Sequence, residues 1–223
     1  MTISASRRTD IPAFYSQWFF NRINEGYVLV PNPYNPNMIS RVSLDPAVID
    51  CVVFWTKNPA PMIERLDRLA DYKYYFQFTL NPYGTELESK LPSLDRRIDT
   101  FKYLADRIGK EKVVWRYDPI LTNEQYTVVF HQDKFAEMAV ALQGYTEKCM
   151  LGFIDHYPHV RASLREFNIE PLAKEDIEAM AVAFRKTADE LSMELDTCTT
   201  RVDLSHIGIP SGLCVDNRLI ERI

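Results

Sequence analysis

Short apolar runs alternate with longer stretches of helical period along almost the whole chain, and this alternation limits the fold more than any other feature. Consecutive strands separated by helices need crossover connections, and such units build parallel sheets. The pattern therefore predicts an α/β fold, in which the strands form either an open doubly wound sheet or a closed or partial barrel. The six apolar runs are Thr2–Ser6, Cys51–Trp55, Tyr74–Leu80, Val113–Tyr117, Lys148–Ile154 and Met193–Thr197.

The stretches between these runs carry helical spacing and helix-end signals. Pro12 suits a first helical turn and Gly26 suits a left-handed helix end, while Ser93 is a good N-cap. The link Pro158–Pro171 is short and poorly periodic. The predicted helices cover about Pro12–Glu25, the segment from Met62 to Ala70, Ser93–Gly109, Gln132–Gln143 and Lys174–Leu191.

Residues Tyr27–Leu44 interrupt the alternation. Pro31, Pro33 and Pro36 fall within six residues, which excludes a helix and favours a stiff extended loop. We interpret the segment as a Pro-rich insertion or small hairpin within a single domain that spans residues 1–223. A helix that begins near Val215 stops after barely two turns, so a genuine terminus and a truncation both stay open.

Several of the strands differ from those of an ordinary parallel sheet because one of their faces is polar. In Tyr74–Asn81 the apolar Phe76 and Phe78 alternate with Gln77 and Thr79, and Val113–Asp118 alternates in the same way. A parallel strand covered by helices on both faces is normally apolar throughout. We therefore predict a TIM-like (β/α) barrel, or a partial barrel, of six to eight mostly parallel strands with a polar interior.

Polar and charged residues recur at the C-terminal ends of these strands, where ligands bind in β/α folds. A buried Arg116 needs an acidic neighbour or an anionic ligand, and Asp118 is the nearest acid on the same strand face. We predict a cluster of mixed charge with a positive surplus, which would bind a polar or anionic small molecule such as a carboxylate or a phosphate. The candidate substrate-binding residues are Arg7, Arg8, Asp10, Lys57, Asn58, Gln77, Thr79, Asn81, Arg116 and Asp118.

Two other classes of function stay open. One is a divalent-metal-dependent barrel hydrolase or isomerase, in which Asp118, Asp155 and His156 would supply carboxylate and imidazole ligands from the strand ends. The other is a non-catalytic barrel that binds a small ligand or a partner.

Composition excludes several classes of partner. The formal net charge of −5, from 26 Lys and Arg against 31 Asp and Glu, gives no sign of nucleic-acid binding. The sequence contains no secretory h-region and no apolar run of membrane-spanning length, so we expect a cytoplasmic protein without a membrane partner. Four cysteines lie far apart without a CxxC motif, so we expect no cofactor on the chain as it stands and interpret them as reduced, buried side chains.

Five motifs, in order, resemble an uncharacterised bacterial family known only as a domain of unknown function. The resemblance covers nearly the whole chain. Full-length members carry a C-terminal cysteine cluster similar to the one that binds a [4Fe–4S] cluster in radical S-adenosylmethionine enzymes. The resemblance therefore implies a barrel enzyme of that type, with [4Fe–4S] and S-adenosylmethionine as cofactors of a longer chain, although this chain lacks the cysteine motif. The motifs are residues 6–12 (SRRTDIP), 32–36 (NPYNP), 54–59 (FWTKNP), 76–84 (FQFTLNPYG) and 115–120 (WRYDPI).

Overall fold

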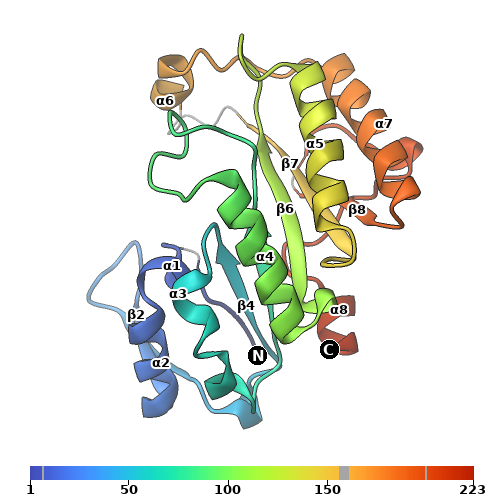
Figure 1. Cartoon of the computed structure of the whole chain (residues 1–223). Coiled ribbons are helices and arrows are strands. Elements are labelled where there is room, and N and C mark those ends of the chain that lie inside the picture. Colours follow the sequence, from blue (N-terminus) through green and yellow to red (C-terminus); the bar gives the residue numbers. More distant parts are fainter. Residues whose placement is uncertain (7, 156–160, 199) are drawn as a thin grey trace.

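The protein is described here from a computed structural model, which describes residues 1–6, 8–155, 161–198 and 200–223. Its centre is a six-stranded sheet in which all neighbouring strands run parallel (Figure 1). The order along the sheet is β1 (Thr2–Ser4), β4 (Cys51–Thr56), β5 (Tyr74–Thr79), β6 (Val113–Ile120), β7 (Lys148–Phe153) and β8 (Glu194–Thr197).

The helices follow the strands along the chain. Short 3₁₀ turns at Pro46–Val48, Leu66–Leu69, Lys110–Lys112 and Ser205–Ile207 complete the described elements. The α-helices are α1 (Ile11–Phe14), α2 (Ser16–Glu25), α3 (Ala60–Ile63), α4 (Leu94–Ile108), α5 (Val128–Leu142), α6 (Arg161–Glu166), α7 (Lys174–Glu190) and α8 (Asn217–Arg222).

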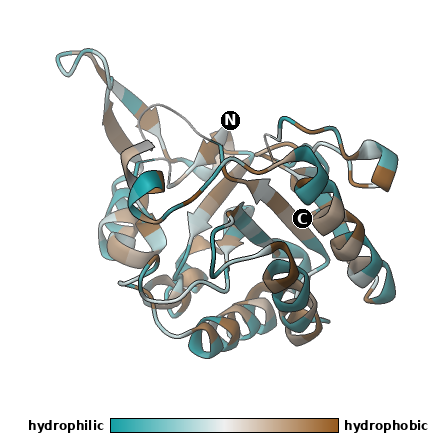
Figure 2. Ribbon diagram, turned by 90° about the horizontal axis from the view of Figure 1, so that it is seen from above, coloured by the Kyte–Doolittle hydropathy of each residue, from teal (hydrophilic) through white to brown (hydrophobic). Residues whose placement is uncertain are grey.

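The strands succeed one another across the sheet in chain order, so every crossover advances in the same direction. Right-handed crossovers that never reverse place their helices on one face of the sheet. The helices accordingly surround a curved sheet in the view along the strands (Figure 2). This arrangement confirms the predicted α/β barrel-like fold and differs from a doubly wound sheet, in which the strand order reverses.

The barrel is partial. Within the described part of the chain β1 pairs only with β4, and β8 pairs with β7 on one side. The other edge of β8 is occupied by the C-terminal segment, because Thr197 N–H donates to Pro210 O (2.9 Å) and Gly212 N–H donates to Thr197 O (2.8 Å). The chain then continues across the inner face of the sheet.

The outer face of the sheet holds the main core. Phe76, Phe78, Trp115 and Tyr117 alternate with polar residues along β5 and β6, and all four are buried beneath the helices. Phe135 of α5 stacks on Trp115 with ring centroids 5.0 Å apart. The predicted separation of apolar outer faces from polar inner faces is therefore correct for these two strands.

The inner face is closed at the N-terminal ends of the strands by the C-terminal segment. Leu219 of α8 packs against a small cluster that includes Val53, Tyr75 and Val114. Lys148 of β7 lies between two carboxylates, pairing with Asp196 and, at 2.9 Å, with Asp216, the residue that caps α8. These contacts leave the C-terminal half of the interior as the place for a ligand.

Three predicted helices have different bounds in the structure. The helix expected over Pro12–Glu25 is divided at Tyr15, and the helix expected after Pro59 is reduced to α3 and the 3₁₀ turn that follows it. Helix α5 begins at Val128 rather than Gln132, because the Thr127 hydroxyl accepts the Phe130 N–H (3.1 Å) and caps the helix.

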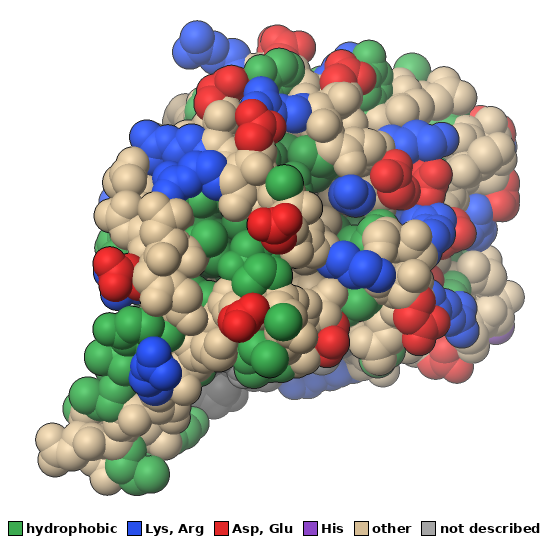
Figure 3. Space-filling model, turned by 90° about the horizontal axis from the view of Figure 1, so that it is seen from below, with side chains coloured by type: hydrophobic (Ala, Val, Ile, Leu, Met, Phe, Trp, Pro, Cys, Tyr) green, Lys and Arg blue, Asp and Glu red, His purple; other side chains and the backbone are tan. Residues whose placement is uncertain are grey.

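The segment that interrupts the alternation is an antiparallel hairpin of β2 (Tyr27–Pro31) and β3 (Ile39–Ser43). It projects from the body of the molecule (Figure 2), and hydrophobic side chains lie along its surface in the space-filling view (Figure 3). Leu29, Tyr34 and Ile39 are among these exposed residues. No helix in the described ranges is long and apolar enough to cross a membrane.

The stability of the protein is expected to depend on the ionisation of His131. Its Nε2–H donates to Leu121 O (2.7 Å), so Nδ1 accepts from the Tyr117 hydroxyl (2.8 Å), and burial lowers the His131 pKa from 6.5 to about 4. Between pH 6.5 and about 4 the unfolded chain binds a proton at His131 that the folded chain does not. The contribution of neutral His131 to the free energy of unfolding is therefore complete above pH 6.5 and is lost as the pH falls towards 4. A shift of this size corresponds to about 3 kcal/mol. Urea titrations at several pH values should show the free energies of unfolding of wild type and His131→Gln converging as the pH falls, and parallel curves would contradict this assignment.

Candidate functional site

Arg116 lies at the centre of the polar interior. It points inward from β6, its side chain is 5% exposed, and it pairs with the Asp118 carboxylate on the same strand face. Nη1–H donates to Gln77 Oε1 (3.3 Å), and the guanidinium carbon lies 4.8 Å from the centre of the Trp55 ring. The predicted ion pair and its inward direction are therefore present in the structure.

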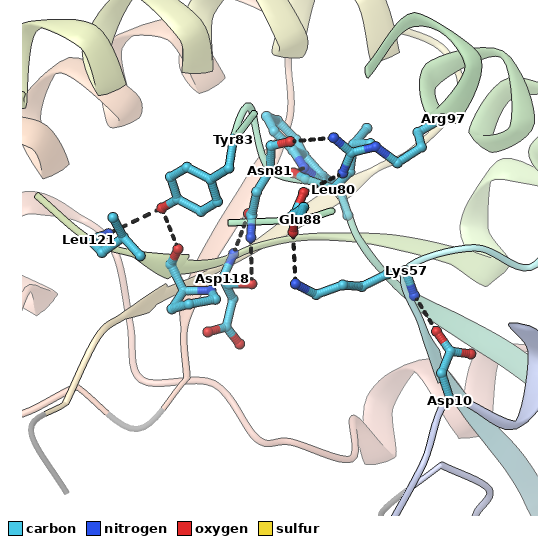
Figure 4. A network of polar contacts seen from close by, with 11 residues as sticks. Asp10, Lys57, Leu80, Asn81, Tyr83, Glu88, Arg97, Asp118 and Leu121 are labelled. Carbon is cyan, nitrogen blue, oxygen red and sulfur yellow. Dashed lines mark hydrogen bonds and ion pairs between the residues drawn. The ribbon is translucent and has the colours of Figure 1, made fainter. Parts of the chain in front are cut away.

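Asn81 fixes the end of β5 to the end of β6. Its side-chain amide donates to Asp118 O (2.9 Å) and accepts the Asp118 N–H (3.0 Å), which reproduces the pairing of a peptide group (Figure 4). Tyr83, two residues further on, donates to Pro119 O (2.6 Å) and accepts the Leu121 N–H (3.2 Å). The backbone around Asp118 is consequently held by side chains of the preceding strand and loop.

A second group of charged side chains is centred on the loop that follows β5. Glu88 is almost fully buried and pairs with Lys57 (2.7 Å) after β4 and with Arg97 (2.8 Å) of α4 (Figure 4). Arg97 also donates to Asn81 O (3.2 Å). Because burying an unpaired charge costs several kcal/mol, the buried Glu88 and Arg97 depend on each other, while the half-exposed Lys57 adds a second cation.

Asp10 joins the end of β1 to the end of β4. One carboxylate oxygen accepts the Ala13 N–H (2.9 Å) and caps α1, while the other accepts the Lys57 N–H (2.7 Å) and the Thr56 hydroxyl (3.0 Å). With both oxygens bonded in this way, Asp10 positions the backbone of Lys57 (Figure 4).

A pocket of about 390 Å³ opens beside these groups, at the C-terminal ends of β1, β4 and β5. Its volume falls within the usual range for small-molecule sites. Trp55, one of the lining residues, has a buried indole N–H with no hydrogen-bond acceptor among the described residues. A buried donor without an acceptor is rare in a native protein and requires an explanation. The lining residues are Ser6, Asp10, Ala13, Phe14, Trp55, Thr56, Lys57, Asn58, Thr79, Lys90 and Leu91.

The predicted residues are distributed between this pocket and the interior behind it. Asp10, Lys57, Asn58 and Thr79 line the pocket, whereas the interior group consists of Gln77, Asn81, Arg116 and Asp118. Arg8 is exposed and donates to Pro31 O (2.9 Å), so its guanidinium lies against the hairpin instead. Arg7 lies outside the described residues.

The positive surplus expected in the interior stays a prediction, because Arg7 lies outside the described residues. Arg97 and Glu88, which the strand pattern did not indicate, add a buried ion pair beside Asn81. Among the described residues Arg116 pairs with Asp118, whereas Arg97 and Lys57 share Glu88. The residues that line the pocket include two cations, Lys57 and Lys90, and one carboxylate, Asp10, so the lining carries one net positive charge, and Lys57 pairs in addition with Glu88 behind it.

The carboxylates proposed as metal ligands have cationic partners. Asp155 pairs with Arg201 (2.8 Å), as Asp118 does with Arg116, while His156 lies outside the described residues. Within the ranges described, no three His, Cys, Asp or Glu side chains are placed to hold a metal ion.

Sequence comparison assigns the chain to a family. The family described as "Domain of unknown function (DUF1848)" matches residues 2–223. The chain belongs to this family. None of the curated protein sequences compared with the DUF1848 chain is similar to it. Among solved structures, one described provisionally as an alpha-L-fucosidase from Bacteroides thetaiotaomicron is similar to 93% of the DUF1848 chain and 81% of its own, with 11% identity and a TM-score of 0.38.

Proposed function

We propose that the DUF1848 barrel binds a polar small molecule with one anionic group in the pocket at the ends of β1, β4 and β5. The observation that carries the proposal is the buried Trp55 indole N–H, which has no acceptor among the described residues and belongs to a side chain that lines the same pocket as Lys57. A carboxylate or phosphate oxygen would accept from such donors, and a charge-assisted hydrogen bond is the stronger kind. The single positive charge of the pocket suits a single anionic group.

Contacts behind the pocket hold the Trp55 side chain in a fixed position. Arg116 stacks on Trp55 and is held by Asp118 and Gln77, so the indole ring has a defined position before any ligand arrives. Preorganised donors of this kind lose little entropy when they bind. The proposed role of Arg116 is therefore to position Trp55, while Lys57 contacts the anionic group.

The motif resemblance leads to a proposal about chemistry, namely that the barrel holds the substrate of a radical S-adenosylmethionine enzyme. The cysteines present do not fit a [4Fe–4S] cluster, which needs at least three thiolates near one another. Cys198 and Cys214 lie together, whereas Cys51 is on the inner face of β4 and Cys149 on the outer face of β7. The ion pairs of Asp118 with Arg116 and of Asp155 with Arg201 disfavour the divalent-metal alternative.

Lys57 provides the first test of the proposal. A panel of small carboxylates and phosphates should include ligands that raise the melting temperature of the wild-type protein, since a ligand that binds only the folded state stabilises it. Lys57→Met should weaken their binding by roughly 10-fold or more, the loss expected for one charge-assisted hydrogen bond.

The control is Lys174→Met on α7, where an exposed lysine pairs with Glu178. This variant should bind the same ligands with wild-type affinity. Equal affinity of wild type and Lys57→Met, measured by calorimetry, would contradict the proposed site.

A further inference from the structure

Two cysteines that are distant in the sequence meet in the barrel interior. The sulfur of Cys198, which follows β8, lies 3.3 Å from the sulfur of Cys214 in the C-terminal segment. Cys198 is buried and Cys214 is exposed. The sequence spacing gave no indication of this pair, and the interpretation of all four cysteines as buried is wrong for Cys214.

Backbone hydrogen bonds hold both cysteines in place. The Cys198 N–H donates to Leu151 O (2.8 Å) of β7. The Cys214 carbonyl accepts from Gln77 Nε2 (3.3 Å), and two residues later the Asp216 N–H donates to the Tyr75 hydroxyl (3.1 Å). The backbone of Cys198 is therefore fixed to β7, and the segment that carries Cys214 is fixed to the inner face of β5.

The environment of the pair includes the buried cation of the site. The charge of Arg116 acts to lower the Cys214 pKa, although burial and the contact with Cys198 outweigh it and leave the pKa above 9.0. Arg116 also interacts with the side chain of Cys198. Arg116 thus acts in favour of the Cys214 thiolate, the form that reacts with disulfides and oxidants.

We propose that Cys198 and Cys214 are a redox-active pair that forms an intramolecular disulfide by exchange with a small-molecule disulfide such as oxidised glutathione. A disulfide bond is about 2.05 Å long, so the sulfurs need to approach by about 1 Å, which side-chain rotation can provide. The bond would join β8 to the segment that closes the interior.

The exchange takes place in two steps. The accessible Cys214 loses its proton and attacks one sulfur of the small disulfide, which forms a mixed disulfide and releases one thiolate. Cys198 then loses its proton and attacks the Cys214 sulfur, and the second thiolate leaves. The two protons go to the two released thiolates, and the two electrons lost by the cysteines reduce the small disulfide to two thiols.

Oxidation would change the site as well as the backbone. It would remove both thiols from the surroundings of Arg116 and would fasten residues 198–214 as a closed loop beside Trp55 and Gln77. Closing a loop of this length restricts the unfolded chain, so the oxidised protein is expected to melt about 5–10 °C higher than the reduced protein.

Peptide mapping by mass spectrometry after incubation with oxidised glutathione tests the pair. The expected product is lighter by two hydrogen atoms and contains a Cys198–Cys214 cross-link, while Cys51 and Cys149, both fully buried, are alkylated only after unfolding. Cys198→Ala should instead accumulate the mixed disulfide at Cys214, because the second thiol is missing. If the wild-type protein keeps both thiols, or keeps a lasting adduct at Cys214 while Cys198 stays a reduced thiol, the proposal is overturned.

The pH dependence of the first step tests the effect of Arg116 on the Cys214 thiol. The rate of adduct formation in Cys198→Ala should increase with pH up to the pKa of Cys214. Additional replacement of Arg116 by Gln should move this profile to higher pH, since it removes the charge that opposes the effect of burial. An unchanged profile would show that Arg116 does not act on Cys214.

Discussion

Replacement of Arg97 by Met is expected to destabilise the protein more than any other single change in the polar interior. Arg97 is 3% exposed and pairs with the buried Glu88, so its loss leaves a carboxylate with only the half-exposed Lys57 as a cationic partner. Removing one partner of a buried ion pair typically costs about 3–5 kcal/mol. In a chain of this size the melting temperature should fall by on the order of 10 °C, as differential scanning calorimetry would show.

Helix α4 offers a matched control for this prediction. Arg107 lies on the same helix and pairs with Glu64 and Asp67, both of which are exposed. Arg107→Met should shift the melting temperature far less, because exposed ion pairs contribute little. Combining Arg97→Met with Glu88→Gln should restore part of the lost stability, since the uncompensated charge disappears. If the two arginine variants melt alike, Glu88 is not the buried partner described here.

The second large effect is expected for Gly152→Ala. Gly152 lies on β7 beside Asp118, and an added Cβ would be 2.3 Å from Asp118 Oδ1 and 2.9 Å from its Cβ. The carboxylate cannot keep its place, so its ion pair with Arg116 would break and leave the guanidinium buried without an acid. We expect a loss of about 3 kcal/mol in urea unfolding, the lower end of the cost of breaking a buried pair.

A double-mutant cycle tests whether the loss of stability in Gly152→Ala results from the displacement of the Asp118 carboxylate. Asp118→Asn should be costly in the wild-type background and nearly neutral in the Gly152→Ala background, because the same interaction is removed only once. Additive effects of the two substitutions would mean that the alanine acts on some other contact.

The fold could be predicted largely from the sequence because its determinants are local. The alternation of Phe76 and Phe78 with Gln77 and Thr79 gave both the strand and its two faces. The ion pair of Arg116 and Asp118 could be predicted because alternate residues of a strand share one face and because burying an unpaired charge is costly. Helix bounds were less accurate, since the caps at Thr127 and Tyr15 depend on the local backbone course.

The groups missed by sequence analysis meet through tertiary contacts. Glu88 lies in a loop without periodicity, so no pattern distinguished it. Arg97 offered a signal that was overlooked, because it continues the apolar stripe of its helix with Phe101 and Leu104 and is buried with them. The Cys198–Cys214 pair depends on the course of the C-terminal segment through the interior, which spacing does not specify.

The central claim is that the Trp55 indole N–H receives a ligand acceptor, and NMR of the three tryptophan indole groups tests it most directly. Trp115 Nε1–H already donates to Leu80 O (2.9 Å), and Trp18 is half-exposed on α2, so both serve as internal references. Addition of a small anion that raises the melting temperature should move the Trp55 indole proton signal downfield and leave that of Trp115 in place. A Trp55 signal that stays unchanged at saturating ligand would contradict the proposed site.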